Sequence, residues 1–358
     1  MKTKKMKILL LADSRSFHTV RFAKALKQQN CHVLTVSLED GEMPFVQLKK
    51  MGPIEQAHYL LAVLPLKKII ERYQPDIINA HFASGYGFIG ALARWQRPIP
   101  LIVNLWGSDI LIVPGKSPLH RLKTVYALKK ADYVVGDSQY LVNAAHQLTP
   151  LKHSEVIPWG IEKEFLHLHK KSYSFHQPVK IIIPRAHETV YNNLFIVKAL
   201  ASLINAGKIT LTFPSFGSLF KKFKSQSRKF VGDKLLFYPK FIRRDFLIFM
   251  AQYDLYLSAS LSDSSPASLI EAMALGLLPV AANIKGVQEW LNPSSGFTFI
   301  QNDHADLFNI INNIINSSNT YDKMRQNNRL RVEQEAVFEH NVAQQIKIMT
   351  RLIEGRTN

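Results

Sequence analysis

The segment LSDSSPASLIEAMALGLLPVAA at residues 261–282 decides how this chain folds. Its order predicts a loop, a helix that ends at Gly276 and then a buried strand. Glycine is favoured just after the last turn of a helix, and a short apolar run suits a parallel sheet. Ser264 and Ser265 are suited to cap that helix, and Pro266 to its first turn. Free N–H groups at such a helix start can bind a phosphate or the hydroxyls of a sugar.

Short apolar runs alternate with helical stretches along the rest of the chain. In the first half we expect strands at 7–12, 32–37, 76–80, 101–105, 133–136 and 155–157, and helices at 19–29, 55–73, 87–94 and 118–130. In the second half we expect strands at 179–184, 210–213, 234–238, 253–257 and 278–281, helices at 194–205, 244–251, 268–275 and 305–315, and a closing helix at about 340–354. This alternation predicts an α/β fold in which helices cover parallel sheets.

The chain of 358 residues is longer than one hydrophobic core usually spans, so we expect two α/β domains. We place them at 1–165 and 178–336, with the closing helix at 337–358 packing toward the first domain. The segment between the domains carries His167, His169 and His176 and has no clean period. We interpret it as a linker rather than a metal site, because no second cluster of metal ligands accompanies it.

The composition is strongly basic, with 45 Lys and Arg against 27 Asp and Glu and a net charge of +18. Such a surface attracts phosphates of nucleic acid or of an anionic membrane, with high solubility as the plain alternative. Basic residues of the first domain include Lys49, Lys50, Lys67, Lys68, Lys116, Arg121, Lys123, Lys129 and Lys130. Interleaved with apolar residues, they favour an anionic membrane surface as a partner. Nucleic acid is disfavoured, because no recognition motif accompanies the charge.

Cysteine usage and hydropathy bear on the compartment. Cys31 is the only cysteine, which excludes an intrachain disulfide and fits a reducing cytoplasm. The apolar run at 8–12 stops at Asp13 and is too short for a signal peptide. No stretch reaches the ~18 apolar residues that a membrane span needs. We therefore expect a cytoplasmic protein, with any membrane contact peripheral on the inner face of the cell membrane.

Two carboxylates frame the predicted helix of the opening segment. Asp263 precedes the helix, and Glu271 lies in its body eight residues later. A carboxylate placed as Glu271 is can accept hydrogen bonds from both hydroxyls of a ribose, and Asp263 would lie nearer a sugar. The pair points to recognition of a nucleotide that carries a sugar.

This segment resembles the signature of the retaining family-4 glycosyltransferases, also called glycosyl transferases group 1, whose fold is GT-B. The family pattern is a glutamate, seven residues, a second glutamate, then Ala-Met-Ala and a glycine. Glu271 matches the second glutamate, and Asp263 takes the place of the first. VIPWGI at 156–161 is similar to the family's VIPNGV at the junction of the lobes. The resemblance implies two Rossmann-like lobes facing across a cleft, with a C-terminal helix that crosses back to the first lobe.

The resemblance also implies a nucleotide-sugar donor site in the second domain. It names Arg185, Asp263 and Glu271 as catalytic, and as donor-binding residues it names these three with Gly217, Phe241, Ser264 and Ser265. Arg185 would hold the donor diphosphate, since a guanidinium is permanently charged and can grip two oxygens. The family's lysine five residues later is Val190 here, and Lys240 is a candidate replacement. We expect no metal and no other cofactor, because arginine and a helix N-terminus stabilise the departing diphosphate.

Four residues of the first domain are candidates for the acceptor side. His18 lies in SFHTVRFA at 16–23, which opens the first predicted helix, and His81 lies at a strand end; either could equally be structural. Asp109 ends NLWGSD, which resembles the family's LHGSD with Trp106 in place of the histidine. An indole can pack against a sugar face but cannot act as a general base. The expected acceptor is a glycan or a lipid-linked glycan, and the expected transfer retains the configuration of the sugar.

Two other functions stay open on the sequence alone. A nucleotide-sugar epimerase of the same fold would need no acceptor. A catalytically idle nucleotide-sugar binding protein is suggested by Val190 in place of lysine and Asp263 in place of glutamate. A nicotinamide dehydrogenase is disfavoured, because no GxGxxG follows the first predicted strand.

Overall fold

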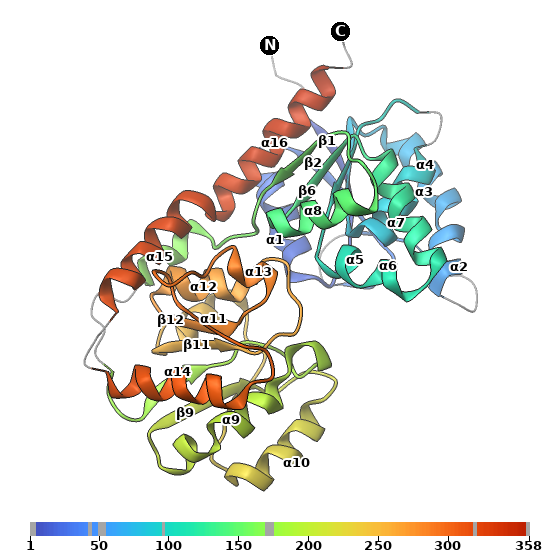
Figure 1. The fold of residues 1–358 in the computed structure, drawn as a ribbon. Helices are drawn as coiled ribbons and strands as arrows, with labels where there is room; N and C mark the ends of the chain where they lie inside the picture. The colour runs from blue at the N-terminus through green and yellow to red at the C-terminus, as the bar shows by residue number, and fades with distance from the viewer. Residues whose placement is uncertain are drawn as a thin grey trace. The chain divides into compact units, whose positions relative to one another are not determined.

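The computed structural model describes residues 5–41, 45–48, 55–94, 97–168, 175–317 and 321–355. The chain forms two compact units, which Figure 1 shows as two groups of helices around strands. The first unit contains Met1–Trp159 and Glu339–Asn358, and the second contains Gly160–Phe338. The two Rossmann-like α/β domains predicted from the sequence are confirmed.

The first unit is built on a parallel sheet. Its described residues form seven strands in the order β3-β2-β1-β4-β5-β6-β7, and each neighbouring pair is parallel. The strands are β1 (Lys7–Leu11), β2 (His32–Ser37), β3 (Val46–Gln47), β4 (Ile77–His81), β5 (Leu101–Asn104), β6 (Tyr133–Gly136) and β7 (Ser154–Val156). All residues of β4 and β5 are buried, as expected for inner strands that helices cover on both faces.

Helices of the first unit connect these strands and pack on the sheet. They are α1 (Phe17–Gln28), α2 (Glu55–Leu61), α3 (Val63–Tyr73), α4 (Phe88–Ala93), α5 (Ser108–Leu111), α6 (Val113–Lys116), α7 (Pro118–Lys130), α8 (Gln139–Leu148) and the C-terminal α16 (Phe338–Glu354). A π-helical segment, η1 (Phe82–Gly87), joins β4 to α4. Figure 1 shows α3, α4 and α7 side by side, and these helices are in contact.

The second unit repeats this plan. Its described residues form six parallel strands in the order β10-β9-β8-β11-β12-β13. The strands are β8 (Val179–Ile182), β9 (Ile209–Pro214), β10 (Leu236–Tyr238), β11 (Leu255–Ser258), β12 (Leu278–Ala282) and β13 (Phe297–Phe299). The helices are η2 (Lys163–Leu168), η3 (Thr189–Tyr191), α9 (Asn193–Asn205), α10 (Phe220–Val231), α11 (Arg243–Met250), α12 (Ala267–Leu275), α13 (Lys285–Gln288), α14 (His304–Asn316) and α15 (Asp322–Glu335).

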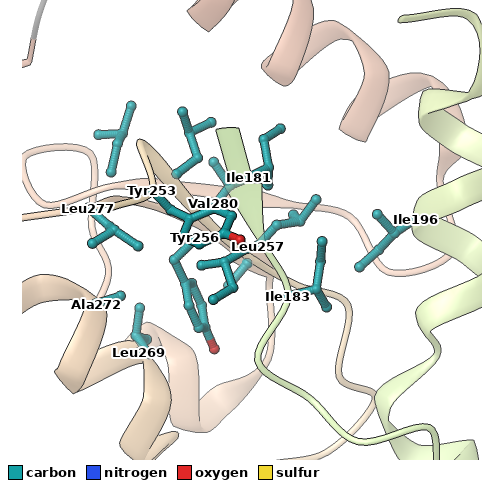
Figure 2. Packing of buried hydrophobic residues seen from close by; sticks show 14 of the residues in the cluster. Ile181, Ile183, Ile196, Tyr253, Tyr256, Leu257, Leu269, Ala272, Leu277 and Val280 are labelled. Atoms are coloured by element: carbon teal, nitrogen blue, oxygen red, sulfur yellow. The ribbon is translucent and has the colours of Figure 1, made fainter. Parts of the chain in front are cut away.

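The core of the second unit lies where the strands meet the helices. Figure 2 shows Ile181 of β8 and Val280 of β12 near Tyr256 of β11, with Ile196 of α9 and Leu269 of α12 packed against the strands. Tyr256 is fully buried, and its hydroxyl lies 3.2 Å from Ser268 Oγ. This core supports the loops that leave β8 and β11, from which the site described below is built.

The boundary between the units differs from the predicted 165. The first unit ends at Trp159, because Ile161 already pairs with Val337 as an isolated parallel bridge in the second unit. Phe165 and Leu166 are buried in the second core. The linker prediction for the histidine-containing segment is therefore wrong at its start, where η2 forms. His169 lies outside the described residues.

The single helix predicted at 55–73 is two helices, α2 and α3, with Ala62 between them. Pro65 in the first turn of α3 has no N–H to donate to the preceding turn, so the ladder of hydrogen bonds cannot run through. The helices α8, α10 and α15 and the short strands β3 and β13 were not predicted. In α10, basic residues outnumber apolar ones, and only Phe223, Ser227 and Val231 are buried.

Candidate functional site

The candidate donor site lies where the strand order of the second sheet reverses. β8 and β11 are neighbours there, and the loops after such strands form the crevice in which ligands bind in open α/β sheets. Arg185 follows β8, and Asp263 lies in the loop after β11. The structure brings these two predicted residues together, with Arg185 Nη2 at 2.7 Å from Asp263 Oδ2. Their side chains are 11% and 18% exposed.

Neighbouring residues contact both the guanidinium and the backbone of Arg185. Its Cζ lies 5.2 Å from the centroid of the Tyr191 ring, and Asn193 Nδ2 donates a 3.0 Å hydrogen bond to the Arg185 carbonyl. Burial alone would lower the pKa of Arg185, but the nearby Tyr256 and Asp263 raise it above its usual value. Nε is buried and has no hydrogen-bond partner among the described residues. A cation held in this way is suited to bind an anion that brings its own acceptors.

Glu271 belongs to a buried group of three charges. It lies in α12 and is 5% exposed, and its Oε1 accepts a hydrogen bond from Arg243 Nη1. Arg243 also donates from Nη2 to Glu162 Oε2 at 2.9 Å. Burial tends to lower the pKa of Arg243, while Glu271 and Glu162 raise it, with a net increase. No local pattern predicts this group, because Glu162 and Arg243 are 81 positions apart in the chain.

Two glycines hold the loops of this site against other parts of the backbone. Gly217 has a φ of +119°, and a Cβ on it would lie 2.2 Å from the backbone nitrogen of His187. A Cβ on Gly286 would lie 2.2 Å from the carbonyl oxygen of Ser264 and 2.4 Å from that of Asp263. Gly217 was predicted as a donor contact, and the structure gives it a packing reason as well. Gly286 was missed.

The other predicted donor residues, Ser264, Ser265 and Phe241, make structural contacts that differ from the predicted ones. Neither Ser264 nor Ser265 caps α12: Pro266 occupies the N-cap position, and the cap has no side-chain hydrogen bond. The Ser265 hydroxyl instead accepts a 2.9 Å bond from Trp290 Nε1. The Phe241 ring stacks at 6.0 Å on Tyr238, so this side chain is part of the packing at the end of β10. The predicted capping role is therefore wrong, because the chain turns at Pro266 before the helix begins.

Val190, at the position of the expected lysine, ties two loops together. Its carbonyl accepts a 2.8 Å hydrogen bond from the backbone N–H of Leu261. A pocket of about 260 Å³ lies beside this loop and is lined by His187, Glu188, Thr189, Asn192, Asn193, Leu194, Leu219, Lys222, Phe223 and Gln226. None of the donor residues named from the sequence lines it. We therefore place the candidate donor site at Arg185 and Asp263 and not in this pocket.

The candidate acceptor residues of the first unit meet at the corresponding reversal of the first sheet, where β1 and β4 are neighbours. His18 lies 5.7 Å from Trp106, and His81 lies 5.5 Å from Trp106, between ring centroids. Trp159 completes the group, at 5.2 Å from His18 and 5.4 Å from Trp106. Phe22 lies 5.3 Å from His81. We call these five residues the aromatic cluster. The sequence named three of them and missed Phe22 and Trp159.

Two polar groups of the aromatic cluster lack partners. Both ring nitrogens of His81 and Nε1 of Trp106 are buried without a hydrogen bond to any described residue. His81 is 2% exposed, and burial lowers its pKa to about 3. Buried polar atoms normally have partners, so an imidazole and an indole left in this way fit a ligand with hydroxyl groups. At neutral pH the His81 ring is uncharged.

Asp109 hydrogen-bonds the backbone of the two loops that carry His81 and Trp106. Its carboxylate accepts hydrogen bonds from Ala83 N at 2.7 Å and from Trp106 N at 2.9 Å. The side chain is fully buried, and burial raises its pKa to about 6 against the opposing effect of these hydrogen bonds. The candidate role in acceptor contact therefore changes to a positioning role, because both oxygens are engaged by the two loops that carry His81 and Trp106.

Within the described residues, no group of three or more His, Cys, Asp or Glu side chains could hold a metal ion. No helix in the described part of the chain is long and apolar enough to cross a membrane.

Comparison with known proteins agrees with these features. Residues 7–138 match the family described as glycosyl transferase 4-like, and residues 166–331 match the glycosyl transferases group 1. An uncharacterized glycosyltransferase of Methanocaldococcus jannaschii is 27% identical over 331 residues, which are 88% of each chain.

Two solved structures have a similar fold. The Anabaena protein HepE, crystallised with UDP and glucose, has a TM-score of 0.79 and 20% identity, covering 96% of this chain and 99% of that one. Sucrose-phosphate synthase from Thermosynechococcus elongatus has a TM-score of 0.83 and 16% identity, covering 98% and 100%. This chain belongs to the group 1 glycosyltransferases and has the two Rossmann-like units of the GT-B fold.

Proposed function

We propose that this protein transfers a sugar from a nucleotide-sugar donor to a glycan or lipid-linked glycan, with retention of configuration and without a metal ion. The observation that carries the proposal is the Arg185–Asp263 pair at the reversal point of the second sheet. HepE, with the same fold, was crystallised with UDP and with UDP-glucose, which supports a uridine nucleotide sugar as the first donor to test.

Arg185 stabilises the departing diphosphate in this proposal. Negative charge on the diphosphate grows as the glycosidic bond breaks, so a fixed cation stabilises the transition state more than the bound donor. The start of α12 adds backbone N–H groups that no side chain caps. Together these groups take the place of a metal ion. Asp263 holds Arg185 in position and orients the donor sugar.

Glu271 binds the ribose of the donor. Arg243 occupies its Oε1, which leaves Oε2 to accept a hydrogen bond from a ribose hydroxyl. The contact with Arg243 fixes this carboxylate in a buried position, where a hydrogen bond to it is stronger than in water.

The acceptor is bound at the aromatic cluster of the first unit. Trp106 and Trp159 offer ring faces to a sugar, and His81 offers a hydrogen bond to one of its hydroxyls. With a pKa of about 3, His81 is a weak base at neutral pH and positions the acceptor rather than taking its proton.

The test is a screen of nucleotide sugars against glycan acceptors with the full chain. Consumption of donor only when an acceptor is present supports a transferase, whereas consumption without acceptor indicates an epimerase. Absence of any turnover with a bound donor indicates an idle binding protein. The anomeric coupling constant of the product, measured by NMR, decides retention. Activity must survive a chelator; loss of activity that a divalent ion restores would contradict the metal-free mechanism.

We further propose that the protein works in the cytoplasm, peripherally at the inner face of the membrane. Lys68, Lys129 and Lys130 are exposed and Lys67 is half-buried on the helices α3 and α7. Each basic residue near an anionic surface contributes ~1 kcal/mol, and the attraction decays within about 8 Å at physiological salt. Sedimentation with anionic vesicles should fall steeply from low to high salt, and changing these four lysines to Glu should abolish it. No binding at low salt would remove this part of the proposal.

A further inference from the structure

A basic pocket of about 310 Å³ lies in the first unit between η1, α2, α6 and α7. Lys116, His120 and Lys123 line it, together with Ser84 and Ser108. The described lining contains no aspartate and no glutamate. Basic side chains and hydroxyls that converge in one pocket are suited to bind an anion.

The segment η1 lines this pocket in a conformation that is unfavourable in itself. It is a six-residue π-helix, and Phe82 at its start has a φ of 75°. An aromatic residue in this region of backbone space costs on the order of 1–3 kcal/mol, and π-helical turns occur frequently at functional sites. Gly85 allows Tyr59 of α2 to approach, since a Cβ there would lie 3.1 Å from its ring. The backbone is therefore strained at Phe82, where η1 forms part of the pocket wall.

Lys123 is buried in the wall of the pocket, whereas its place among the basic residues of the first domain predicts a surface charge. It is 6% exposed, and its Nζ lies 5.3 Å from the centroid of the Tyr59 ring and 5.9 Å from that of Phe88. Aromatic faces stabilise a lysine ammonium in a partly dry position. These two rings thus hold the Lys123 ammonium in place. The second lysine of the pocket, Lys116, lies on the short helix α6.

Two segments that line the pocket also carry residues of the aromatic cluster. Phe82 follows His81, and Ser108 comes two residues after Trp106, while Asp109 hydrogen-bonds both segments. Large apolar side chains are exposed in the lining, namely Ile112 at 42%, and close to lining residues in the sequence, namely Leu60 at 55%, Leu64 at 69%, Leu119 at 51% and Leu122 at 64%. A small hydrophilic anion would make no use of them, but an anion attached to an apolar chain would bury them.

We propose that this pocket binds the phosphate headgroup of an amphiphilic acceptor, whose apolar chain contacts the exposed leucines and Ile112. Lys116 and Lys123 supply the charge and Ser84 and Ser108 supply hydrogen bonds. The assignment of the ligand as the acceptor rests on the proposed function. Phosphate fits the lining because it carries one to two negative charges at neutral pH and several acceptor oxygens.

Calorimetric titration of the full chain tests the proposal without any assay of transfer. The probes are dihexanoyl phosphatidic acid, inorganic phosphate and neutral dihexanoylglycerol. The two lipids are used below their critical micelle concentrations. We expect phosphatidic acid to bind at least about tenfold more tightly than either of the others, because only it has both a charge and apolar chains. Failure of phosphatidic acid to bind would overturn the proposal. Equal binding of inorganic phosphate would overturn the role of the apolar residues.

Variants locate the binding. Lys116→Gln and Lys123→Met should each weaken phosphatidic acid binding by about tenfold or more, the loss expected for a charge-assisted hydrogen bond. Lys24→Gln, which removes an exposed charge on α1 of the same unit, should leave it unchanged. Equal losses in all three variants would show attraction to net charge only and would overturn the site. UDP titration of the same samples reports on the second unit, so a failed donor proposal is seen separately.

Discussion

The two candidate sites occupy corresponding places in two similar sheets but differ in chemistry. In the second unit the site is ionic, with Arg185 paired to Asp263 and Arg243 paired to Glu271 and Glu162. In the first unit the aromatic cluster consists of ring side chains, and its His81 is neutral. The charged groups beside it are the backbone-bound Asp109 and Arg21, whose guanidinium lies 5.8 Å from the centroid of the Trp159 ring.

This difference fits the ligands that we propose for the two sites. A diphosphate is recognised by fixed cations, and its growing charge is stabilised by them. A sugar hydroxyl is recognised by neutral hydrogen-bonding groups and ring faces. The same sheet topology therefore supports either task, since the topology only decides where the loops meet and the loop residues decide the chemistry.

Among the variants that test this difference between the two sites, Arg243→Met should have the largest effect, and that effect is on stability. This change leaves Glu162 and Glu271 buried without their cation, and removing one partner of a buried ion pair typically costs ~3–5 kcal/mol. The free energy of unfolding, measured by urea titration, should fall by about that amount. Adding Glu162→Gln and Glu271→Gln should recover part of it. The exposed neighbour variant Arg244→Met is the control and should change stability by no more than about 0.5 kcal/mol. Equal stability of the Arg243 and Arg244 variants would sink the idea.

Arg185→Ala should lower turnover more than donor affinity. Removal of one group that stabilises a developing negative charge commonly lowers kcat by about 100- to 1,000-fold. Arg185→Lys should restore only part, because a lysine lacks the planar fork that meets two oxygens. The measurements are steady-state kinetics and calorimetric donor titration. Parent-like kcat in both variants would remove Arg185 from the reaction.

Glu271→Gln should weaken nucleotide binding by about 1–3 kcal/mol, since an amide accepts hydrogen bonds less strongly than a carboxylate and loses the ion pair with Arg243. Calorimetry with UDP gives the affinity, and urea titration separates this effect from a change in stability. A folded variant with unchanged affinity would place the ribose elsewhere.

His81→Phe should separate stability from function in the neutral site. It replaces unpartnered ring nitrogens by carbon, so stability at pH 7 should be unchanged or higher by about 1 kcal/mol, while transfer to the acceptor falls about tenfold. Transfer as efficient as that of the parent would show that the imidazole makes no contact with the acceptor.

The pH dependence of stability sharpens this test. The pKa of His81 is about 3 in the folded chain against 6.5 ordinarily, so its unfolded form binds more protons between these values. The contribution of His81 is therefore present above pH 6.5 and is lost as the pH falls toward 3, at up to ~1.4 kcal/mol per unit. Asp109, raised from 3.8 to about 6, acts in the opposite sense and loses its contribution as the pH rises to 6. Only the first slope should disappear in His81→Phe; an unchanged profile would contradict the assignment.

Much of the fold could be predicted from local sequence. Strands such as 7–12 and 278–281 were found because a buried parallel strand is a short apolar run bounded by polar residues. The break at Ala62 and the helix α10 were harder, because one depends on a single proline and the other has few apolar residues. In the site, Arg185, Asp263, Glu271 and Trp106 were named from the family resemblance. His81 was named from its place at a strand end, and His18 from its place at the start of the first predicted helix.

The sequence by itself determined the two α/β units and the segments that end at the functional loops, because hydrophobic period and helix-ending residues act over a few positions. Only the tertiary structure decided which side chains meet there. It paired Arg243 with Glu162, placed Trp159 beside His18, and buried Lys123 between Tyr59 and Phe88. These contacts join residues far apart in the chain, and they depend on the order of strands in each sheet, which no local pattern encodes.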